Sequence, residues 1–249
     1  MPTHIVYPRI LLRNRKCLYA YCLMGNHYHR LVKTPEAKVK MRSQSAAPSA
    51  EAFVRAFVAI AMGKDVRARL TETMGSLQRA GAHVAWVAPA NIHLSLAFLG
   101  NVTWDMVPLI GAALDEATAA CAPFSLAVAE VGSFGSARSP RVIWAGVRES
   151  PALRELQGRV ARGIMALGLT IEEREYRPHL TLGRVRSSRG RDELVQAMAA
   201  VAGQEFGRIE AREVLLMKSR LLPAGAEHSV VHRAPCATAD AAGSPRGAP

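Results

Sequence analysis

Two segments of the sequence repeat one pattern, in which a histidine and a hydroxyl residue alternate with leucines: residues 93–96 read HLSL and residues 179–182 read HLTL. Residues two positions apart on a β-strand point to the same face of a sheet. On a strand, His93 and Ser95 would therefore share one face, while the leucines that alternate with them enter a hydrophobic core. The pattern predicts a polar face built over an apolar one.

The second segment predicts the same arrangement and adds a positive charge. His179 and Thr181 would share a strand face, and Arg177 falls on that face too. Two imidazoles suit general acid and general base catalysis, because their ordinary pKa lies near neutrality. Hydroxyls donate hydrogen bonds to the non-bridging oxygens of a phosphate, and an arginine neutralises its charge. We therefore expect phosphate chemistry that requires no metal and no other cofactor.

Both segments lie in a body, residues 51–235, in which strand and helix patterns alternate. The expected strands cover residues 53–62, 91–100, 124–131, 141–147, 178–185, 209–217 and 228–233. The expected helices cover residues 66–77, 104–120, 151–167 and 191–202. Strands outnumber helices, and no glycine-rich phosphate loop follows any of the expected strands. This favours an α+β fold over a doubly wound nucleotide-binding fold.

Turn-forming and helix-capping residues predict where some of these strands and helices begin or end. The pair Gly100-Asn101 predicts a turn at the end of the strand that carries the first motif. Ser150-Pro151 predicts the start of a helix, because proline is favoured at the first helical position, and Gly168 predicts its end. His228 and His232, near the last strand, are expected at the surface, and a contact with the substrate channel is the alternative.

The flanks of the body differ from it in composition. Residues 36–50 are small and polar and predict a linker, whereas residues 236–249 are rich in Ala, Gly and Pro and predict a disordered tail. The net charge of the chain is +12, and residues 1–50 hold nine Lys/Arg against one acid. A basic segment of this kind either aids solubility only or binds a polyanion such as nucleic acid.

Composition also narrows the class of protein. The four cysteines form no CxxC pair, so neither a zinc site nor a disulfide framework is indicated. No run approaches the roughly 18 consecutive apolar residues of a membrane helix. Basic residues interrupt the apolar stretch near the start, which argues against a secretory signal. We expect a cytoplasmic protein with no membrane partner.

The motifs and their surroundings resemble the 2H phosphoesterases, and one branch in particular, the RNA 2',3'-cyclic phosphodiesterases, also called bacterial 2'-5' RNA ligases. The resemblance covers about residues 53–234. It is carried by the segments RAFVAIAM, HVAWVAPANIHLSLAFLGNV, SPRVIWAGV, YRPHLTLGRV and LMKSRLLPAG. It implies a fold of two α+β lobes, related by a pseudo-twofold axis, around a central cleft to which each lobe contributes one motif.

The resemblance also implies a role for each residue of the two motifs. His93 would donate a proton to the departing 3' oxygen, and His179 would accept a proton from the attacking water. Ser95 and Thr181 would hold the phosphate oxygens, and Arg177 would bind the same phosphate. Ser95 departs from the family pattern, in which threonine is commoner, and serine lacks the methyl group that restricts the threonine rotamer.

The activity implied is hydrolysis of RNA 2',3'-cyclic phosphate ends to 2'-phosphomonoesters by a monomeric enzyme whose partner is RNA. Three alternatives stay open within the body. The same site could join a cyclic phosphate to a 5'-hydroxyl through a 2'-5' linkage, or it could act on small cyclic nucleotides. The body could also be an RNA-binding module without catalytic activity.

A second resemblance concerns residues 1–35. The segment AYCLMGNHYH, followed by KTPE, is similar to the metal-binding strand of the REP-associated tyrosine transposases. His27 and His29 would share a strand face and could bind a divalent metal with a third ligand. The rest of that fold is absent, including a helix with the nucleophilic tyrosine, so we expect a non-functional fragment. The alternative is a transposon-derived DNA-binding protein with an inert phosphoesterase body.

Overall fold

The computed structural model describes residues 12–14, 17–24, 27–33, 40–42, 52–136, 138–171, 175–222 and 225–237. Within the first fifty residues it describes an antiparallel sheet of β1 (Leu12–Asn14), β2 (Cys17–Met24), β3 (His27–Lys33) and β4 (Lys40–Arg42), in that order. The side chains of His27 and His29, on which the metal hypothesis depends, lie outside the described residues.

The body consists of nine strands and four α-helices in the described part of the chain. Its strands are β5 (Phe53–Ile60), β6 (Val84–Trp86), β7 (Leu94–Thr103), β8 (Phe124–Ser136), β9 (Ser139–Val147), β10 (His179–Val185), β11 (Glu205–Ala211), β12 (Glu213–Leu222) and β13 (Gly225–Pro235). Its helices are α1 (Lys64–Gln78), α2 (Val107–Ala119), α3 (Pro151–Ala166) and α4 (Arg191–Ala200), with short 3-10 turns η2 (Pro89–Asn91) and η3 (Trp104–Met106). None of the helices in these residues is long and apolar enough to span a membrane.

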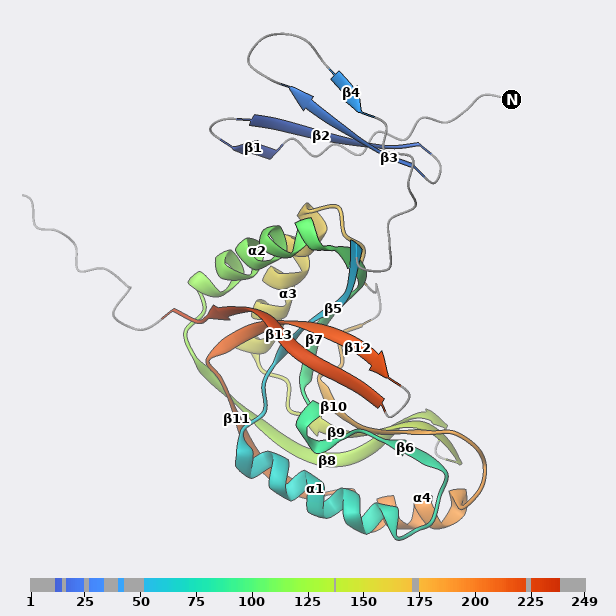
Figure 1. Ribbon diagram of the computed structural model, residues 1–249. Coiled ribbons are helices and arrows are strands. Elements are labelled where there is room, and N and C mark those ends of the chain that lie inside the picture. The colour runs from blue at the N-terminus through green and yellow to red at the C-terminus, as the bar shows by residue number, and fades with distance from the viewer. Residues whose placement is uncertain are drawn as a thin grey trace, which may run out of the picture.

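The strands of the body form one curled antiparallel sheet in the order β11-β8-β9-β10-β7-β5-β12-β13, and β6 adds to the side of β10 (Figure 1). The middle of this order lies between β10 and β7, with four strands on each side. These two strands are the ones that carry the histidine motifs. The sheet is therefore two half-sheets joined at a seam between β7 and β10, as the expected two-lobed fold requires.

The helices interleave the two halves. Helix α1 lies between β5 of one half and β6, which pairs with β10 of the other, and it packs on β11 and α4 of that second half. Helix α3 connects β9 to β10 and packs on α2 and β7 of the opposite half. Figure 1 shows the pairs α1/α4 and α2/α3 at opposite ends of the body. Helix α3 therefore covers the half opposite to the one whose strands it connects, and the chain passes from one half to the other several times.

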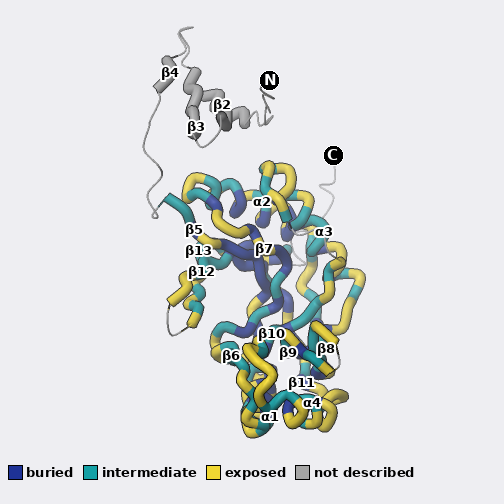
Figure 2. The backbone as a smooth tube through the Cα atoms, turned by 90° about the vertical axis from the view of Figure 1, so that its right-hand side faces the viewer, coloured by how far each residue is buried: buried dark blue, intermediate teal, exposed yellow. Residues whose placement is uncertain are grey.

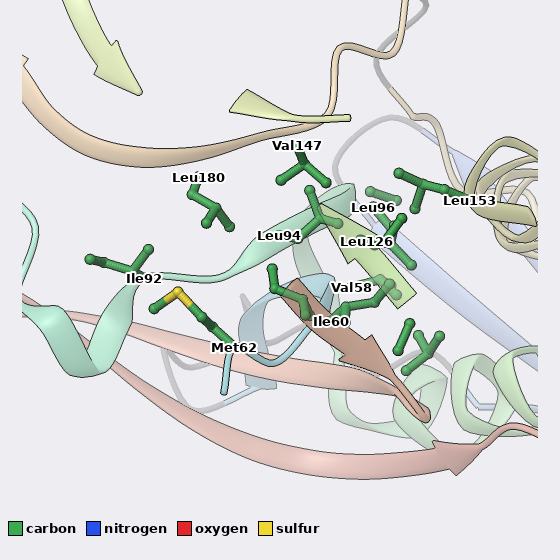
Figure 3. Packing of buried hydrophobic residues seen from close by; sticks show 14 of the residues in the cluster. Val58, Ile60, Met62, Ile92, Leu94, Leu96, Leu126, Val147, Leu153 and Leu180 are labelled. Carbon is green, nitrogen blue, oxygen red and sulfur yellow. The ribbon is translucent and has the colours of Figure 1, made fainter. Parts of the chain in front are cut away.

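The seam is built from leucines, as the alternation of the two motifs predicts. Leu94 and Leu180 are backbone partners and both are fully buried. Leu96 and Leu182 continue the buried side of their strands. Figure 3 shows Leu94 and Leu180 within the packed core, and Figure 2 shows the buried colour concentrated along β7. Burying these side chains fixes the register, because a slip of one residue would turn every leucine to the opposite face.

The prediction of a turn at Gly100-Asn101 is wrong. Strand β7 continues through this pair to Thr103. The register with β5 shifts here, since Phe57 pairs with Phe98 and Ala56 with Gly100, which leaves Leu99 as an extra residue. Gly100 has a φ of 68°, the left-handed conformation that glycine adopts without strain. The glycine thus permits a β-bulge within a long strand and not a chain reversal.

The prediction of a single strand over residues 209–217 is wrong as well, because the chain leaves one partner strand and joins others within this range. Strand β11 pairs with β8 at one edge of the sheet, whereas β12 pairs with β5 and β13 in the other half. The two strands are separated by Arg212 alone. Buried residues continue across this corner, at Ile209, Ala211 and Val214, so the apolar pattern gives no sign of it.

The helix expected after Ser150 is confirmed. Helix α3 begins at Pro151, and the Ser150 hydroxyl accepts a hydrogen bond from the backbone N–H of Leu153 at 3.2 Å. This bond satisfies one of the N–H groups that lack a partner at the start of a helix. Gly168, with a φ of 78°, follows the last turn as expected.

The end of the body is held by backbone hydrogen bonds. Cys236 donates to the carbonyl of Arg212 at 2.8 Å, and Ala237 donates to the carbonyl of Cys121 at 3.0 Å. The remainder of the expected tail, residues 238–249, lies outside the described residues.

The seam predicts where the fold is most sensitive. Leu180→Ala should lower the free energy of unfolding by about 2–5 kcal/mol, because it leaves a cavity in a well-packed core. Leu221→Ala is the matched control, since Leu221 is 65% exposed near the end of β12. Urea unfolding of both variants checks this. Equal losses of stability would show that the seam is not a centre of packing.

Candidate active site

The two histidines of the motifs are held in the same way. In each, Nδ1–H donates to the carbonyl of the residue two positions earlier: His93 to Asn91, and His179 to Arg177, both at 2.7 Å. A carbonyl only accepts, so Nδ1 carries the proton when the ring is neutral. In both rings, therefore, Nε2 is the nitrogen left to give or take a proton.

The register at the seam brings the two motifs together. Leu94 pairs with Leu180 in an antiparallel ladder. Continuing this ladder by one residue on each side places His93 opposite Thr181 and His179 opposite Ser95. All four side chains then lie on the face opposite the buried leucines. The two histidines are diagonal neighbours, which in a regular antiparallel ladder lie roughly 7–8 Å apart. A phosphate fits between groups at this separation.

Different aromatic neighbours surround the two imidazoles. The Phe57 ring stacks on His93, with 4.5 Å between ring centroids and 26° between planes. The ring of His228 stands edge-on to the same imidazole, with centroids 5.4 Å apart. On the other side, Phe134 meets His179 edge to face at 4.8 Å. The backbone hydrogen bonds that orient the two imidazoles are thus equivalent, whereas the side chains that pack around them differ.

This packing changes the acidity of His93. Burial lowers the pKa of its imidazole to about 4, because the charged form loses hydration. The hydrogen bond to the Asn91 carbonyl acts in the opposite direction, and the charge of His228 lowers the pKa further. In the free protein at neutral pH, His93 is therefore uncharged.

A cavity of about 520 Å³ opens beside His179. It lies between the start of β7, the β8–β9 hairpin, α3 and the chain that leads into β10. Tyr176 borders it and donates from its hydroxyl to the Ser95 carbonyl at 3.2 Å. Burial raises the pKa of this phenol well above its ordinary range, so it remains a donor. The cavity is lined by Ser95, Leu96, Ala97, Phe98, Phe134, Gln157, Ile171, Glu175, Tyr176, Arg177 and His179.

Arg177 is placed differently from the other predicted residues. Its guanidinium lines the cavity, but it pairs with the Glu175 carboxylate, with 3.0 Å between Nη2 and Oε2. Both side chains are largely exposed. The contact that Arg177 makes to the catalytic face is through its backbone carbonyl, which orients His179.

Three aromatic residues of the site were missed by sequence reasoning. His228, expected at the surface, is partly buried and contacts the rings of His93 and Phe57, which favours the alternative of a residue near the site. Phe57 is buried, as the prediction of a buried strand requires, but its ring packs on His93 and does not join the main core cluster. Phe134 lies beyond the expected end of its strand. Residues 56–60 are all apolar and buried, so the sequence of β5 does not single out Phe57, and the contacts of all three residues are long-range.

Comparison with known proteins places the body in one family. The family model of the 2'-5' RNA ligase superfamily matches residues 64–220. A protein of Methanothermobacter thermautotrophicus, described as an RNA 2',3'-cyclic phosphodiesterase, is 33% identical over 172 residues, which span 69% of this chain and 93% of that protein. One from Archaeoglobus fulgidus with the same description is 32% identical over 172 residues, spanning 69% and 94%.

Solved structures agree on the fold. A crystal structure from Thermus thermophilus superposes with a TM-score of 0.62 at 25% identity, covering 73% of this chain and 97% of that one. Apo LigT of E. coli gives a TM-score of 0.60 at 24% identity, covering 75% and 99%. The expected α+β fold is therefore confirmed. The family match leaves out residues 1–35, whose expected likeness to a transposase gains no support from it.

The lowered pKa of His93 predicts a contribution to stability that acid removes. The unfolded chain binds this proton near pH 6.5, and the folded protein binds it near pH 4. As pH falls through this window, the unfolded state takes up more protons, so the free energy of unfolding decreases by about 3 kcal/mol. His93→Gln removes this dependence. Urea unfolding at about pH 7 and about pH 4.5 should show a smaller loss in the variant; parallel losses would contradict a buried neutral imidazole.

Proposed function

The chain belongs to the 2'-5' RNA ligase superfamily, and on this premise we propose that it is an RNA 2',3'-cyclic phosphodiesterase that opens the cyclic phosphate at RNA ends to a 2'-phosphomonoester. The observation that carries the proposal is the pair of imidazoles at the seam. Each is oriented by its Nδ1–H bond to a carbonyl, and each lies across the strand pair from a hydroxyl. Such a pair suits proton transfer on opposite sides of one phosphate.

The proposed reaction is an in-line displacement at phosphorus. Nε2 of His179 removes a proton from water as its oxygen bonds to phosphorus. The bond from phosphorus to the 3' oxygen breaks on the opposite side, and Nε2–H of His93 gives that oxygen a proton. The product carries a 3'-hydroxyl and a 2'-phosphate, and the two histidines exchange protons with solvent before the next turnover. In this scheme all proton transfer is done by the two imidazoles.

The pKa of His93 makes binding part of this mechanism. An imidazole with a pKa of about 4 is uncharged at neutral pH and has no second proton to give. A cyclic phosphate carries one negative charge, and an opposite charge within a few ångströms raises the pKa of a histidine. We therefore assign proton uptake by His93 to the binding step. The enzyme would then carry a charged donor chiefly when a substrate is present.

The hydroxyls of Ser95 and Thr181 are assigned to the non-bridging oxygens. Negative charge on these oxygens grows in the transition state, so donors aimed at them lower the barrier. Arg177 is assigned to the same phosphate, which requires its guanidinium to leave Glu175. Because that pair is exposed, screening by solvent makes the exchange inexpensive.

The cavity beside His179 favours a second candidate function, ligation by the same site. Its volume of about 520 Å³ far exceeds the space that one attacking water requires. Phe98 and Phe134 offer aromatic surface in it, on which a nucleobase can stack. A nucleoside bound there would present its 5'-hydroxyl to His179 in place of water. The bond formed would be a 2'-5' linkage.

The proposed hydrolysis is tested on a short RNA that ends in a 2',3'-cyclic phosphate, with EDTA present. The wild-type protein should yield a 2'-phosphate end. His93→Ala and His179→Ala should each lower kcat by about a hundred-fold or more, because each removes a proton-transfer group. Chromatography against authentic 2'- and 3'-phosphate standards identifies the product.

A matched control uses a histidine outside the site. His83 is exposed and hydrogen-bonds to Ser187, so His83→Ala should retain full activity. A 3'-phosphate product would overturn the assignment of the leaving oxygen to His93. Activity in both motif variants would overturn the two-histidine mechanism, and activity only after a divalent metal is restored would show that proton transfer by these residues is not sufficient.

The departure from threonine at position 95 gives a separate prediction. Ser95→Ala removes a donor to a charged oxygen and should lower kcat/KM by roughly ten- to a hundred-fold. Ser95→Thr keeps the hydroxyl and restricts its rotamer, so it should match or exceed wild type. Steady-state kinetics on the cyclic-phosphate RNA checks both. Equal activity in the alanine and serine forms would exclude Ser95 from phosphate binding.

A further inference from the structure

Beyond Phe57, the sheet carries a row of polar side chains that the reaction does not use. Arg55 on β5 pairs with Asn101 on β7 at one side and with Ser219 on β12 at the other. Ser219 pairs in turn with His228 on β13. Directly opposed residues in antiparallel strands point to the same face, with Cβ atoms about 5 Å apart. The four residues Asn101, Arg55, Ser219 and His228 thus form one cross-strand row, called here the polar row.

The polar row lies on the catalytic face of the sheet. Phe57 is two residues from Arg55 on the same strand and therefore shares its face. The Phe57 ring stacks on His93 and meets the His228 ring at 5.0 Å. Ala56 and Val58, on the opposite face, belong to the core. The His228 end of the row therefore lies beside His93, and the row crosses the half-sheet from β13 over β12 and β5 to Asn101 on β7.

Every member of the row can donate a hydrogen bond, and none is acidic. Arg55 is exposed, and no carboxylate of the described residues lies within 4.0 Å of its guanidinium. The nearest acid in sequence to the row, Glu227, pairs with Arg220 in the register and so points to the other face. A guanidinium, an amide, a hydroxyl and an imidazole form a set suited to an anion.

We propose that the polar row is a second phosphate subsite, which binds a backbone phosphodiester of the RNA strand on the 5' side of its cyclised nucleotide. The inference rests on the proposed function, because His93 marks the side on which the ribose leaves. The strand to which that ribose belongs must continue over the half-sheet of His93, where the row lies. Arg55, the charged member of the row, lies next to Phe57 on the same face of β5, one two-residue repeat of the strand beyond the ring that stacks on His93.

The subsite distinguishes a polymer end from a mononucleotide. A 2',3'-cyclic mononucleotide carries only the phosphate between the two catalytic histidines and gains nothing from the row. A dinucleotide with the same cyclic end adds one phosphodiester, and a hydrogen bond to a charged group strengthens binding by roughly ten- to a hundred-fold. The row would therefore direct the enzyme to RNA ends over small cyclic nucleotides.

The test compares three substrates: a 2',3'-cyclic mononucleotide, the dinucleotide with the same cyclic end, and that dinucleotide with an uncharged methylphosphonate linkage. Wild type should prefer the charged dinucleotide to the other two by about ten-fold or more in kcat/KM. Arg55→Gln and Ser219→Ala should each weaken the preference while leaving the mononucleotide rate within about two-fold. Arg212→Gln, which alters an exposed arginine at the corner between β11 and β12, is the control and should keep it.

A binding measurement keeps this test independent of turnover. Calorimetry with the dinucleotide that ends in a 2'-phosphate should show weaker binding to Arg55→Gln than to wild type, and no difference for its methylphosphonate form. Equal use of all three substrates by wild type, or a loss in Arg55→Gln that is the same for all three, would overturn the subsite. Absence of turnover with retained charge-dependent binding would overturn the proposed function and leave the subsite standing.

Discussion

The site depends on one backbone pairing, that of Leu94 with Leu180. This pairing joins the half-sheet β11-β8-β9-β10, with β6 beside β10, to the half-sheet β7-β5-β12-β13, and it is held because both leucines are fully buried. With the leucines inward, the residues on either side of each must face outward together. The catalytic face is therefore a consequence of core packing: whatever keeps the seam in register also keeps two imidazoles and two hydroxyls within reach of one small anion.

Two equivalent histidines become different through what packs around them. The same hydrogen bond to a carbonyl two residues earlier orients both rings. Only His93 is enclosed by a phenylalanine and another histidine, and its pKa falls accordingly. Its counterpart borders an open cavity. A nearly symmetric frame thus yields an asymmetric pair, which is what a reaction with separate proton donor and acceptor requires.

The sequence was informative where local pattern determines structure. Alternation predicted the buried leucines and the shared face of His93 and Ser95, and cap residues predicted α3. Prediction failed where a neighbour is distant in sequence. Gly100 looked like a turn because the β5 partner that makes it a bulge was not visible. His228 looked like a surface residue because its contact with His93 spans most of the body. The family resemblance supplied the two-lobed fold, which periodicity alone would not have given.

The interleaving of the two halves has a consequence for synthesis. Strand β5, near the beginning of the body, pairs with β12, near its end, and the Asn91 side chain binds the Ala226 carbonyl across 135 residues. A chain emerging from the ribosome, N-terminus first, therefore cannot complete the half-sheet β7-β5-β12-β13 until the last hairpin has left the exit tunnel. An unfinished chain would expose the apolar face of its first strands without having assembled the phosphate site. We therefore expect fragments that lack the last hairpin to aggregate and to lack the activity proposed for the complete body.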